Sequence, residues 1–200
     1  VIGWDVAGTV VAVGSQVSER HVGQRVIAAM PQGGYAEKAV ASVGATVPLP
    51  DNISYEDGAT LPVAFVTAWY ALEKRAHLRD GEVVLIQAGA GGVGSASVQL
   101  AKSFGASVIA TVSGPSQAEF VKGLGADHVV DFRKEDFREC VQRITEARGV
   151  DVAVDFVGGK TLLWCIECLA LGGRLVSVGD MMLEPVMLDV SQMVVKGISL

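Results

Sequence analysis

The sequence predicts an α/β fold with two parts, in which a parallel sheet covered by helices on both faces follows a shorter β-rich segment. Three observations support it. Short apolar runs broken by glycine and proline fill the first part, strands and helices then alternate, and a glycine-rich turn joins the first of those strands to a helix. Such alternation is typical of βαβ units and a parallel sheet. We expect two domains, residues 1–59 and 60–200.

The first part of the chain contains several β-like runs separated by turn residues. These runs are TVVAV (9–13), QRVIAAM (24–30), YAEKAV (35–40) and ATVPL (45–49). Their spacing favours a small barrel or sandwich, although so few strands cannot close a barrel. Ser54 followed by Asp57 resembles a capping box, and the apolar pattern then predicts a helix from Thr60 to Ala76.

The second part alternates strictly between strand and helix patterns. Strands are predicted at 83–88, 107–112, 128–132, 152–157 and 174–179, and helices at 94–104, 116–123, 135–148 and 160–171. The strands are continuous in Val, Ile and Leu, as strands buried on both faces are. A last apolar run, VVKGISL, predicts one more strand at 194–200.

The run GAGGVG at residues 89–94 satisfies the pattern G-x-G-x-x-G directly after a buried strand and at the start of a helix. In this setting the pattern predicts a dinucleotide-binding turn, and the parallel sheet is then a doubly wound Rossmann sheet. We expect Gly89 to form the tight turn, Gly91 to admit a pyrophosphate, and Gly94 to let the helix approach the strand. The N-terminus of the helix offers free N–H groups to the phosphates.

The end of the second strand of this sheet bears on the choice of dinucleotide. An NAD site usually places Asp or Glu there, but this strand ends in TVSG (111–114), and the next acidic residue is Glu119. Without a carboxylate to repel a 2′-phosphate, NADP is favoured and NAD is the alternative. Ser113 can donate hydrogen bonds, and Lys122 and Arg133 are the nearest cations in sequence.

Composition excludes several classes of protein. Half of the residues are hydrophobic, 19% are charged and the formal net charge is −6, which argues against a nucleic-acid or anionic-membrane partner. No apolar run approaches the roughly 20 residues of a membrane-spanning helix. The three cysteines do not suggest a disulfide framework, so we expect a reducing, cytoplasmic location.

In collinear order along its whole length, the sequence resembles the zinc-independent quinone oxidoreductases, relatives of zeta-crystallin, in the medium-chain dehydrogenase/reductase superfamily. The stretches that carry the resemblance include GWDVAGTVVAVG (3–14), VGQRVIA (22–28), GGYAEKAV (33–40), LPVAFVTAWYAL (61–72), AGAGGVGSASVQLAK (88–102), GADHVVDFRKEDF (125–137), VDFVGG (154–159) and GGRLVSVG (172–179). The resemblance implies a GroES-like catalytic domain followed by a Rossmann domain, with the active site between them. It also implies further segments at both ends, so that the chain is a fragment.

The resemblance also implies which residues contact the cofactor. Together with the glycine motif and the nearest cation, the expected cofactor-binding residues are Thr67, Gly89, Gly91, Gly92, Val93, Gly94, Ser113, Arg133, Phe156, Val157, Val178 and Gly179. Two departures weaken the preference for NADP, because Gln117 stands where many members have Lys and Phe132 where a Tyr is common. No catalytic residue is selected.

Zinc-containing alcohol dehydrogenases share the implied architecture, so we looked in this sequence for the residues that bind zinc in those enzymes. Their Gly-His-Glu motif is replaced by Gly3-Trp4-Asp5, and their second ligand falls near Val63. The four cysteines of their structural zinc lobe are also missing from this sequence. We therefore expect no zinc and no other metal.

The resemblance implies an oxidoreductase that uses NADPH to transfer hydride to a small-molecule quinone or conjugated enone without zinc. A homodimer is expected, with the terminal strand pairing across a two-fold axis. Two alternatives stay open: an enoyl-thioester reductase, either free-standing or a module of a synthase, and a non-catalytic, crystallin-like NADPH-binding protein.

Two other features admit two interpretations each. Cys165 and Cys168 have a redox or zinc spacing, but the apolar pattern around them favours helix positions in a core. Asp155 ends a strand, where it is either part of a site or a carboxylate that caps a turn.

Overall fold

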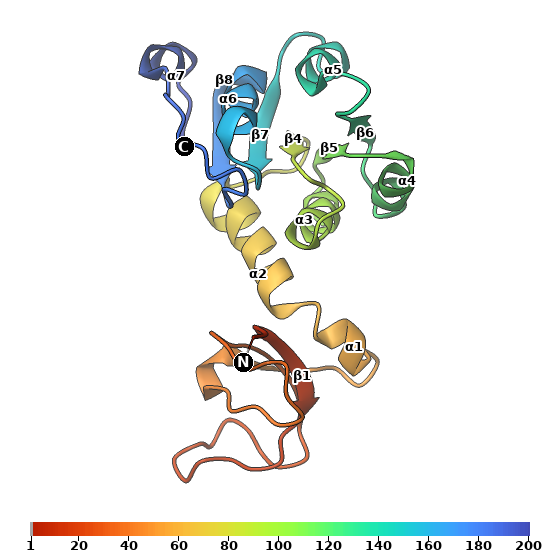
Figure 1. Cartoon of the computed structure of the whole chain (residues 1–200), viewed down its shortest axis with the longest axis vertical. Helices are drawn as coiled ribbons and strands as arrows, with labels where there is room; N and C mark the ends of the chain where they lie inside the picture. The colour runs from red at the N-terminus through yellow and green to blue at the C-terminus, as the bar shows by residue number, and fades with distance from the viewer. Residues whose placement is uncertain (1) are drawn as a thin grey trace. The chain divides into compact units, whose positions relative to one another are not determined.

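The computed structural model describes residues 2–200 and contains two compact units, one ending at Val66 and the other beginning at Thr67. The first unit holds a three-stranded antiparallel sheet and the second a five-stranded parallel sheet with helices (Figure 1). This confirms the predicted α/β class, a Rossmann sheet preceded by a small β-rich part. The domain limit proposed between residues 59 and 60 stays a prediction.

The first unit is built on the strands β1 (Asp5–Thr9), β2 (Arg25–Ala29) and β3 (Thr46–Pro48), in that order across the sheet. A single turn of 3₁₀ helix, η1 (Val43–Ala45), leads into β3. The registers Ala7↔Ile27 and Ile27↔Val47 align the three strands.

Two strand predictions in this unit are wrong. The strand expected at 9–13 lies earlier, as β1, because Asp5–Thr9 finds its ladder partner in β2. The run at 35–40 forms no strand: the Tyr35 N–H donates to the Ile2 carbonyl, and the residues after it are exposed. Apolar patterning alone does not make a strand when a segment lacks a neighbour with which to pair.

Helical structure begins at the predicted cap but is divided into three pieces. Ser54 caps α1 (Tyr55–Gly58), because its side chain accepts the Asp57 N–H at 3.0 Å. The helix predicted from Thr60 to Ala76 is then α2 (Pro62–Trp69), followed by a π-helical segment, η2 (Tyr70–Arg75). Wider i→i+5 bonding is the mark of such a segment.

The second unit is a parallel sheet in the order β6-β5-β4-β7-β8. Its strands are β4 (Val83–Ile86), β5 (Ser107–Val112), β6 (His128–Asp131), β7 (Val150–Asp155) and β8 (Leu169–Ser177). The chain runs outward from β4 to β6 and then returns to place β7 on the other side of β4. This reversal of strand order is the switch point at which doubly wound folds bind ligands.

Helices cover both faces of this sheet, as Figure 1 shows. They are α3 (Gly92–Ser103), α4 (Pro115–Gly123), α5 (Phe137–Ile144) and α6 (Gly159–Cys168). Because side chains alternate along a strand, Val84 and Ile86 join the core under α3 and α4, whereas Leu85 joins the core under α5 and α6.

The strand predicted at 194–200 is wrong. Residues 190–196 form the helix α7 (Val190–Lys196), with Asp189 as its N-cap and Gly197 in the left-handed conformation after it. Only Ser199 pairs with the sheet, in an isolated parallel bridge to Arg174 of β8. Two strong local signals, an Asp cap and a C-terminal glycine, prevail over the β-branched run between them.

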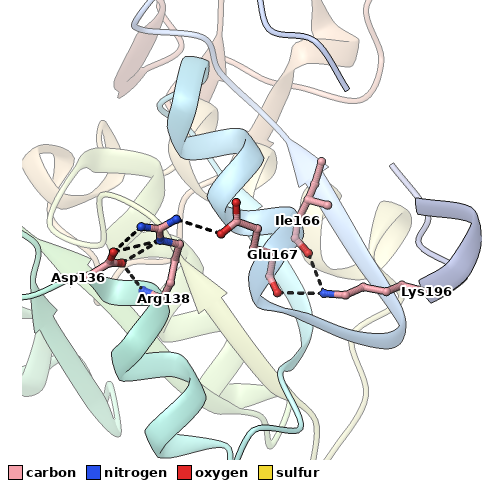
Figure 2. A network of polar contacts seen from close by, with 5 residues as sticks. All are labelled: Asp136, Arg138, Ile166, Glu167 and Lys196. Atoms are coloured by element: carbon pink, nitrogen blue, oxygen red, sulfur yellow. Dashed lines mark hydrogen bonds and ion pairs between the residues drawn. The ribbon is translucent and has the colours of Figure 1, made fainter. Parts of the chain in front are cut away.

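Lys196 attaches α7 to the end of α6. Its ammonium donates to the carbonyl of Glu167 at 2.9 Å and also to those of Ile166 and Leu169, at the C-terminal end of α6 and the start of β8 (Figure 2). Arg138 of α5 joins the same network through a 3.0 Å ion pair with the Glu167 carboxylate.

Among residues 2–200, no helix combines the length and the apolar character needed to cross a bilayer.

Candidate functional site

Apart from Thr67, the expected cofactor-binding residues of the second unit follow its strands at one edge of the sheet. The glycine loop follows β4, and the others are Ser113 after β5, Arg133 after β6, Phe156 and Val157 after β7, and Val178 and Gly179 after β8. Carboxyl ends of parallel strands meet at the same edge, so the fold gathers these residues. Thr67 lies elsewhere, half-buried on α2, and its contact with the cofactor stays a prediction.

The glycine loop is a closed turn held by main-chain hydrogen bonds. The Gly89 N–H donates to the Thr111 carbonyl at 2.8 Å, and the Gly91 N–H donates to the Ala88 carbonyl at 2.9 Å. Ala88, with φ of +48°, is the left-handed residue of the turn. Gly89 lies within the turn as expected, but the positive φ falls on Ala88, one residue before it.

The glycines instead serve close packing and access. A Cβ on Gly94 would clash with the Ala88 carbonyl and stand 3.0 Å from the Gly89 Cα, so α3 packs against the loop only with glycine there. A Cβ on Gly89 would stand 2.9 Å from that of Ala110. At Gly92 the space is open, and both Gly91 and Gly92 are exposed.

The N-terminus of α3 is available to an anion. Gly91 is its N-cap and has no side chain with which to accept the first N–H groups. The N–H groups of Gly92, Val93 and Gly94 therefore need an outside acceptor, and the helix dipole favours a negative one. These residues fit the pyrophosphate of a dinucleotide.

Ser113 lies beside the loop, at the end of β5, and is engaged by Gln117. Both its N–H and its hydroxyl donate to the Gln117 Oε1, at 2.9 and 3.0 Å. The neighbouring strand end carries Arg133, which is exposed. A bound phosphate could therefore accept hydrogen bonds from the N–H and the hydroxyl of Ser113, which now share the Gln117 Oε1, and could pair with the charge of Arg133.

A second turn, after β7, is held by Asp155, whose side chain is completely buried. One carboxylate oxygen accepts the Val157 N–H at 3.1 Å and the other accepts the Gly158 N–H at 2.9 Å. Burial raises the pKa of Asp155, while these two hydrogen bonds act in the opposite direction. The interpretation of Asp155 as a turn-capping carboxylate is confirmed.

The residues around this turn are packed closely. The Phe156 side chain belongs to the core under α3 and α4, so its main chain is the part left for a ligand. The Val178 N–H donates to the Asp155 carbonyl at 2.8 Å, and a Cβ on Gly179 would stand 2.9 Å from the Phe156 carbonyl oxygen. Glycine at 179 lets the ends of β7 and β8 meet.

Sequence reasoning missed two polar residues beneath the glycine loop, Gln87 and Thr111. Both are buried, with exposed fractions of 3% and 0%. The Thr111 hydroxyl donates to the Gln87 Oε1 at 2.7 Å and accepts the Ala88 N–H at 3.1 Å. The available signal was a polar residue near the end of each of two mostly apolar strand patterns, VVLIQA and SVIATV.

The residues at the zinc-ligand positions do not fit a zinc ion. Trp4 offers no ligand, and Val63 contributes its N–H to the Asp5 carboxylate at 2.7 Å rather than a side-chain donor. Across residues 2–200, no three His, Cys, Asp or Glu side chains gather as a metal site requires.

The two cysteines of α6 are core residues. Cys165 and Cys168 are exposed by 0% and 1% and are not joined by a disulfide. Burial raises the pKa of Cys168 to about 12 and that of Cys165 well above its usual range. Thiols that stay protonated make poor nucleophiles and poor metal ligands, which agrees with the core interpretation.

This arrangement defines a dinucleotide-binding fold: a doubly wound sheet with a glycine loop at its switch point. Family comparison agrees, since the model described as "Zinc-binding dehydrogenase" matches residues 92–200 and that described as "Alcohol dehydrogenase GroES-like domain" matches residues 1–51. The chain belongs to the medium-chain dehydrogenase/reductase superfamily. Within it, the chain belongs to the family whose model is described as "Zinc-binding dehydrogenase".

Curated relatives include large synthases. The chain is 36% identical over 178 residues to a phthioceranic/hydroxyphthioceranic acid synthase of Mycobacterium tuberculosis, a match that covers 89% of this chain and 8% of the synthase. It is 35% identical over 182 residues to a highly reducing polyketide synthase of a fungal species, covering 90% of this chain and 7% of that protein. The chain thus spans less than a tenth of the length of these relatives.

Solved structures give the same fold. The CurK enoyl reductase is 37% identical with a TM-score of 0.87, and the match covers 98% of this chain and 58% of that one. The Escherichia coli quinone oxidoreductase complexed with NADPH is 32% identical with a TM-score of 0.91, covering 99% of this chain and 61% of that one. The Pseudomonas syringae quinone oxidoreductase is 33% identical with a TM-score of 0.89, covering 99% and 62%.

Proposed function

We propose that this chain binds NADPH and belongs to a reductase that transfers hydride to an acceptor activated by conjugation, a quinone or an enone. The observation that carries the proposal is the glycine loop at the switch point, where unpaired N–H groups face the position of a pyrophosphate. The quinone oxidoreductase of E. coli, a relative of this fold, is complexed with NADPH. The chemistry that the cofactor supplies when bound is hydride donation.

The protein's own residues bind and orient in this proposal. The N-terminus of α3 holds the pyrophosphate, Ser113 and Arg133 hold the adenosine phosphate, and the Phe156–Val157 turn lies toward the nicotinamide ribose. Since Trp4 and Val63 do not ligate zinc, no metal polarises the acceptor in this proposal. Positioning therefore carries the reaction, and only acceptors with an electron-poor double bond or quinone ring react readily.

A second acceptor class, an enoyl thioester, is favoured by a specific observation. The synthases and the CurK enoyl reductase are 35–37% identical to this chain, whereas the two quinone oxidoreductases are 32–33% identical. In this case the chain is part of an enoyl-reducing module.

A homodimer and a cytoplasmic location are also proposed. The three free cysteines support the cytoplasmic location.

Titration of the protein with NADPH and with NADH, followed by nicotinamide fluorescence, tests cofactor binding. We expect NADPH to bind more tightly than NADH, because no carboxylate opposes the 2′-phosphate. The preference should be modest, about threefold to tenfold, because Gln117 supplies no charge to attract that phosphate. Turnover of a quinone, an enone and an enoyl thioester then ranks the acceptors. Absence of binding of either dinucleotide contradicts the proposal, and binding without any turnover favours a non-catalytic role.

A further inference from the structure

Three buried polar side chains end adjacent strands of the parallel sheet, on the face covered by α5 and α6. They are Thr111 of β5, Gln87 after β4 and Asp155 of β7, with exposed fractions of 0%, 3% and 0%. In residues 2–200, the other buried polar side chain is that of Ser97, on α3. A buried polar group without a hydrogen-bond partner destabilises the fold, so the hydrogen-bond partners of these three side chains indicate the roles of the side chains.

Thr111 uses both its main chain and its side chain to hold the start of the glycine loop. Its carbonyl accepts the Gly89 N–H at 2.8 Å, and its hydroxyl oxygen accepts the Ala88 N–H at 3.1 Å. Two consecutive amides of the loop are thus fixed by one residue. The first of them belongs to Ala88, whose φ of +48° is unfavourable for a residue with a Cβ.

Gln87 orients the hydroxyl that makes this contact. Its Oε1 accepts the Thr111 hydroxyl proton at 2.7 Å, which leaves the oxygen lone pairs of Thr111 to face Ala88. Gln87 is itself fixed at the switch point, since its N–H donates to the Val154 carbonyl of β7 at 3.0 Å. Its side-chain amide also lies 3.5 Å from the Cys165 sulfur of α6.

The conformation of Ala88 decides where the rest of the loop lies. Its carbonyl accepts the Gly91 N–H at 2.9 Å and packs against Gly94 in the first turn of α3. Relaxation of Ala88 to a negative φ would rotate that carbonyl away from Gly91. The N–H groups that start α3 would then lose their fixed direction.

We propose that Thr111, oriented by Gln87, is a positioning residue that holds the glycine loop ready for the pyrophosphate of a dinucleotide. The inference rests on the proposed function and adds to it a buried contact that acts on the loop from beneath. Its role is pre-organisation: the loop pays no ordering cost on binding because it is already ordered. Loss of the hydroxyl therefore weakens binding of the pyrophosphate and leaves contacts with the adenosine phosphate as they are.

The test compares Thr111→Val with Thr111→Ser and with a matched control, Thr145→Val. Thr145 also has a hydroxyl that donates to a carbonyl, that of Val141, and accepts an N–H, that of Gly149, but it lies at the end of α5. We expect T111V to raise the Kd for NADPH about tenfold or more, and T111S and T145V to stay within about threefold of wild type. Adenosine 2′-monophosphate, which has no pyrophosphate, should bind T111V within about twofold of wild type.

Hydrogen exchange of the Ala88 amide in the protein without cofactor provides a second measurement. We expect faster exchange in T111V and, to a smaller extent, in Gln87→Met, with no change in T145V. If T111V folds poorly, Q87M carries the same comparison, since it keeps the hydroxyl but removes the acceptor that orients it. Wild-type affinity for NADPH in T111V, with Ala88 still protected, overturns the positioning role. Wild-type protein that binds no dinucleotide overturns the proposed function instead.

Discussion

The two faces of the parallel sheet are built from the same five strands and differ at one end. On the face under α3 and α4, the central strands are apolar to their last residue, as at Ile86 and Val154. On the face under α5 and α6, Leu85, Ile109 and Ala153 are apolar, and the next inward residues are Gln87, Thr111 and Asp155.

The difference separates two tasks. Apolar side chains along the strands exclude water and stabilise the domain, but they give no direction to the turns that follow. Buried polar side chains at the strand ends offer fixed hydrogen-bond partners to those turns, and each pairs with main-chain amides after β4 or β7, directly or through a neighbour. Most of the length of the strands therefore stabilises the domain through apolar packing. The layer of buried polar side chains at the strand ends instead holds the following turns in position.

The largest expected effect comes from removing apolar packing two residues before Gln87. Leu85→Ala should lower the free energy of unfolding by about 2–5 kcal/mol, because Leu85 is completely buried and the substitution leaves a cavity. Urea denaturation measures this change. The Kd for NADPH should stay within about twofold of wild type at a temperature where the variant is folded. A parallel loss of affinity would show that the two tasks are not separable.

A smaller effect on stability, with a loss of binding, is expected where α3 meets the loop. Gly94→Ala should lower the free energy of unfolding by about 1–3 kcal/mol and weaken NADPH binding, because its methyl group would clash with the Ala88 carbonyl. Gly92→Ala is the matched control for stability and should change it by no more than about 0.5 kcal/mol, since no atom lies within 4 Å of the added carbon. Equal destabilisation by the two variants would contradict this packing.

The smallest effect is a pH dependence at Asp155. Burial raises its pKa above the unfolded value of 3.8, so its contribution to stability is fully present below pH 3.8 and is lost as pH rises through the native pKa. Asp155→Asn keeps one acceptor and has no such titration. We expect the free energy of unfolding of wild type to fall relative to that of D155N as the pH rises from 3 to 7, because only wild type carries the buried titrating carboxyl. A rise over this range would contradict the direction of the shift.

Much of the parallel sheet could be predicted because its signals are local. The strand predicted at 107–112 is β5 at its full length, and Ser54 caps a helix as its spacing with Asp57 predicts. The glycine pattern at 89–94 was also found at its predicted strand–helix junction. Each of these signals is complete within a few residues of sequence.

The failures have a common physical cause. Residues 35–40 and 194–200 have strand-like composition, but a strand exists only through hydrogen bonds to another strand, and pairing is decided by the rest of the fold. The left-handed residue of the loop is Ala88 rather than a glycine, and its N–H is held by Thr111, 23 residues later in the sequence.

The sequence by itself determined the fold class, the glycine loop and the position of that loop in the first βαβ unit. Those features depend on composition, period and spacing along the chain, whereas the positions of the replaced zinc ligands came from the family resemblance. Only the tertiary structure decided that Gln87, Thr111 and Asp155 form one buried polar layer beneath the loops. Strands that are distant in sequence bring them together, and the low dielectric of the interior gives their hydrogen bonds the strength to hold a turn in place.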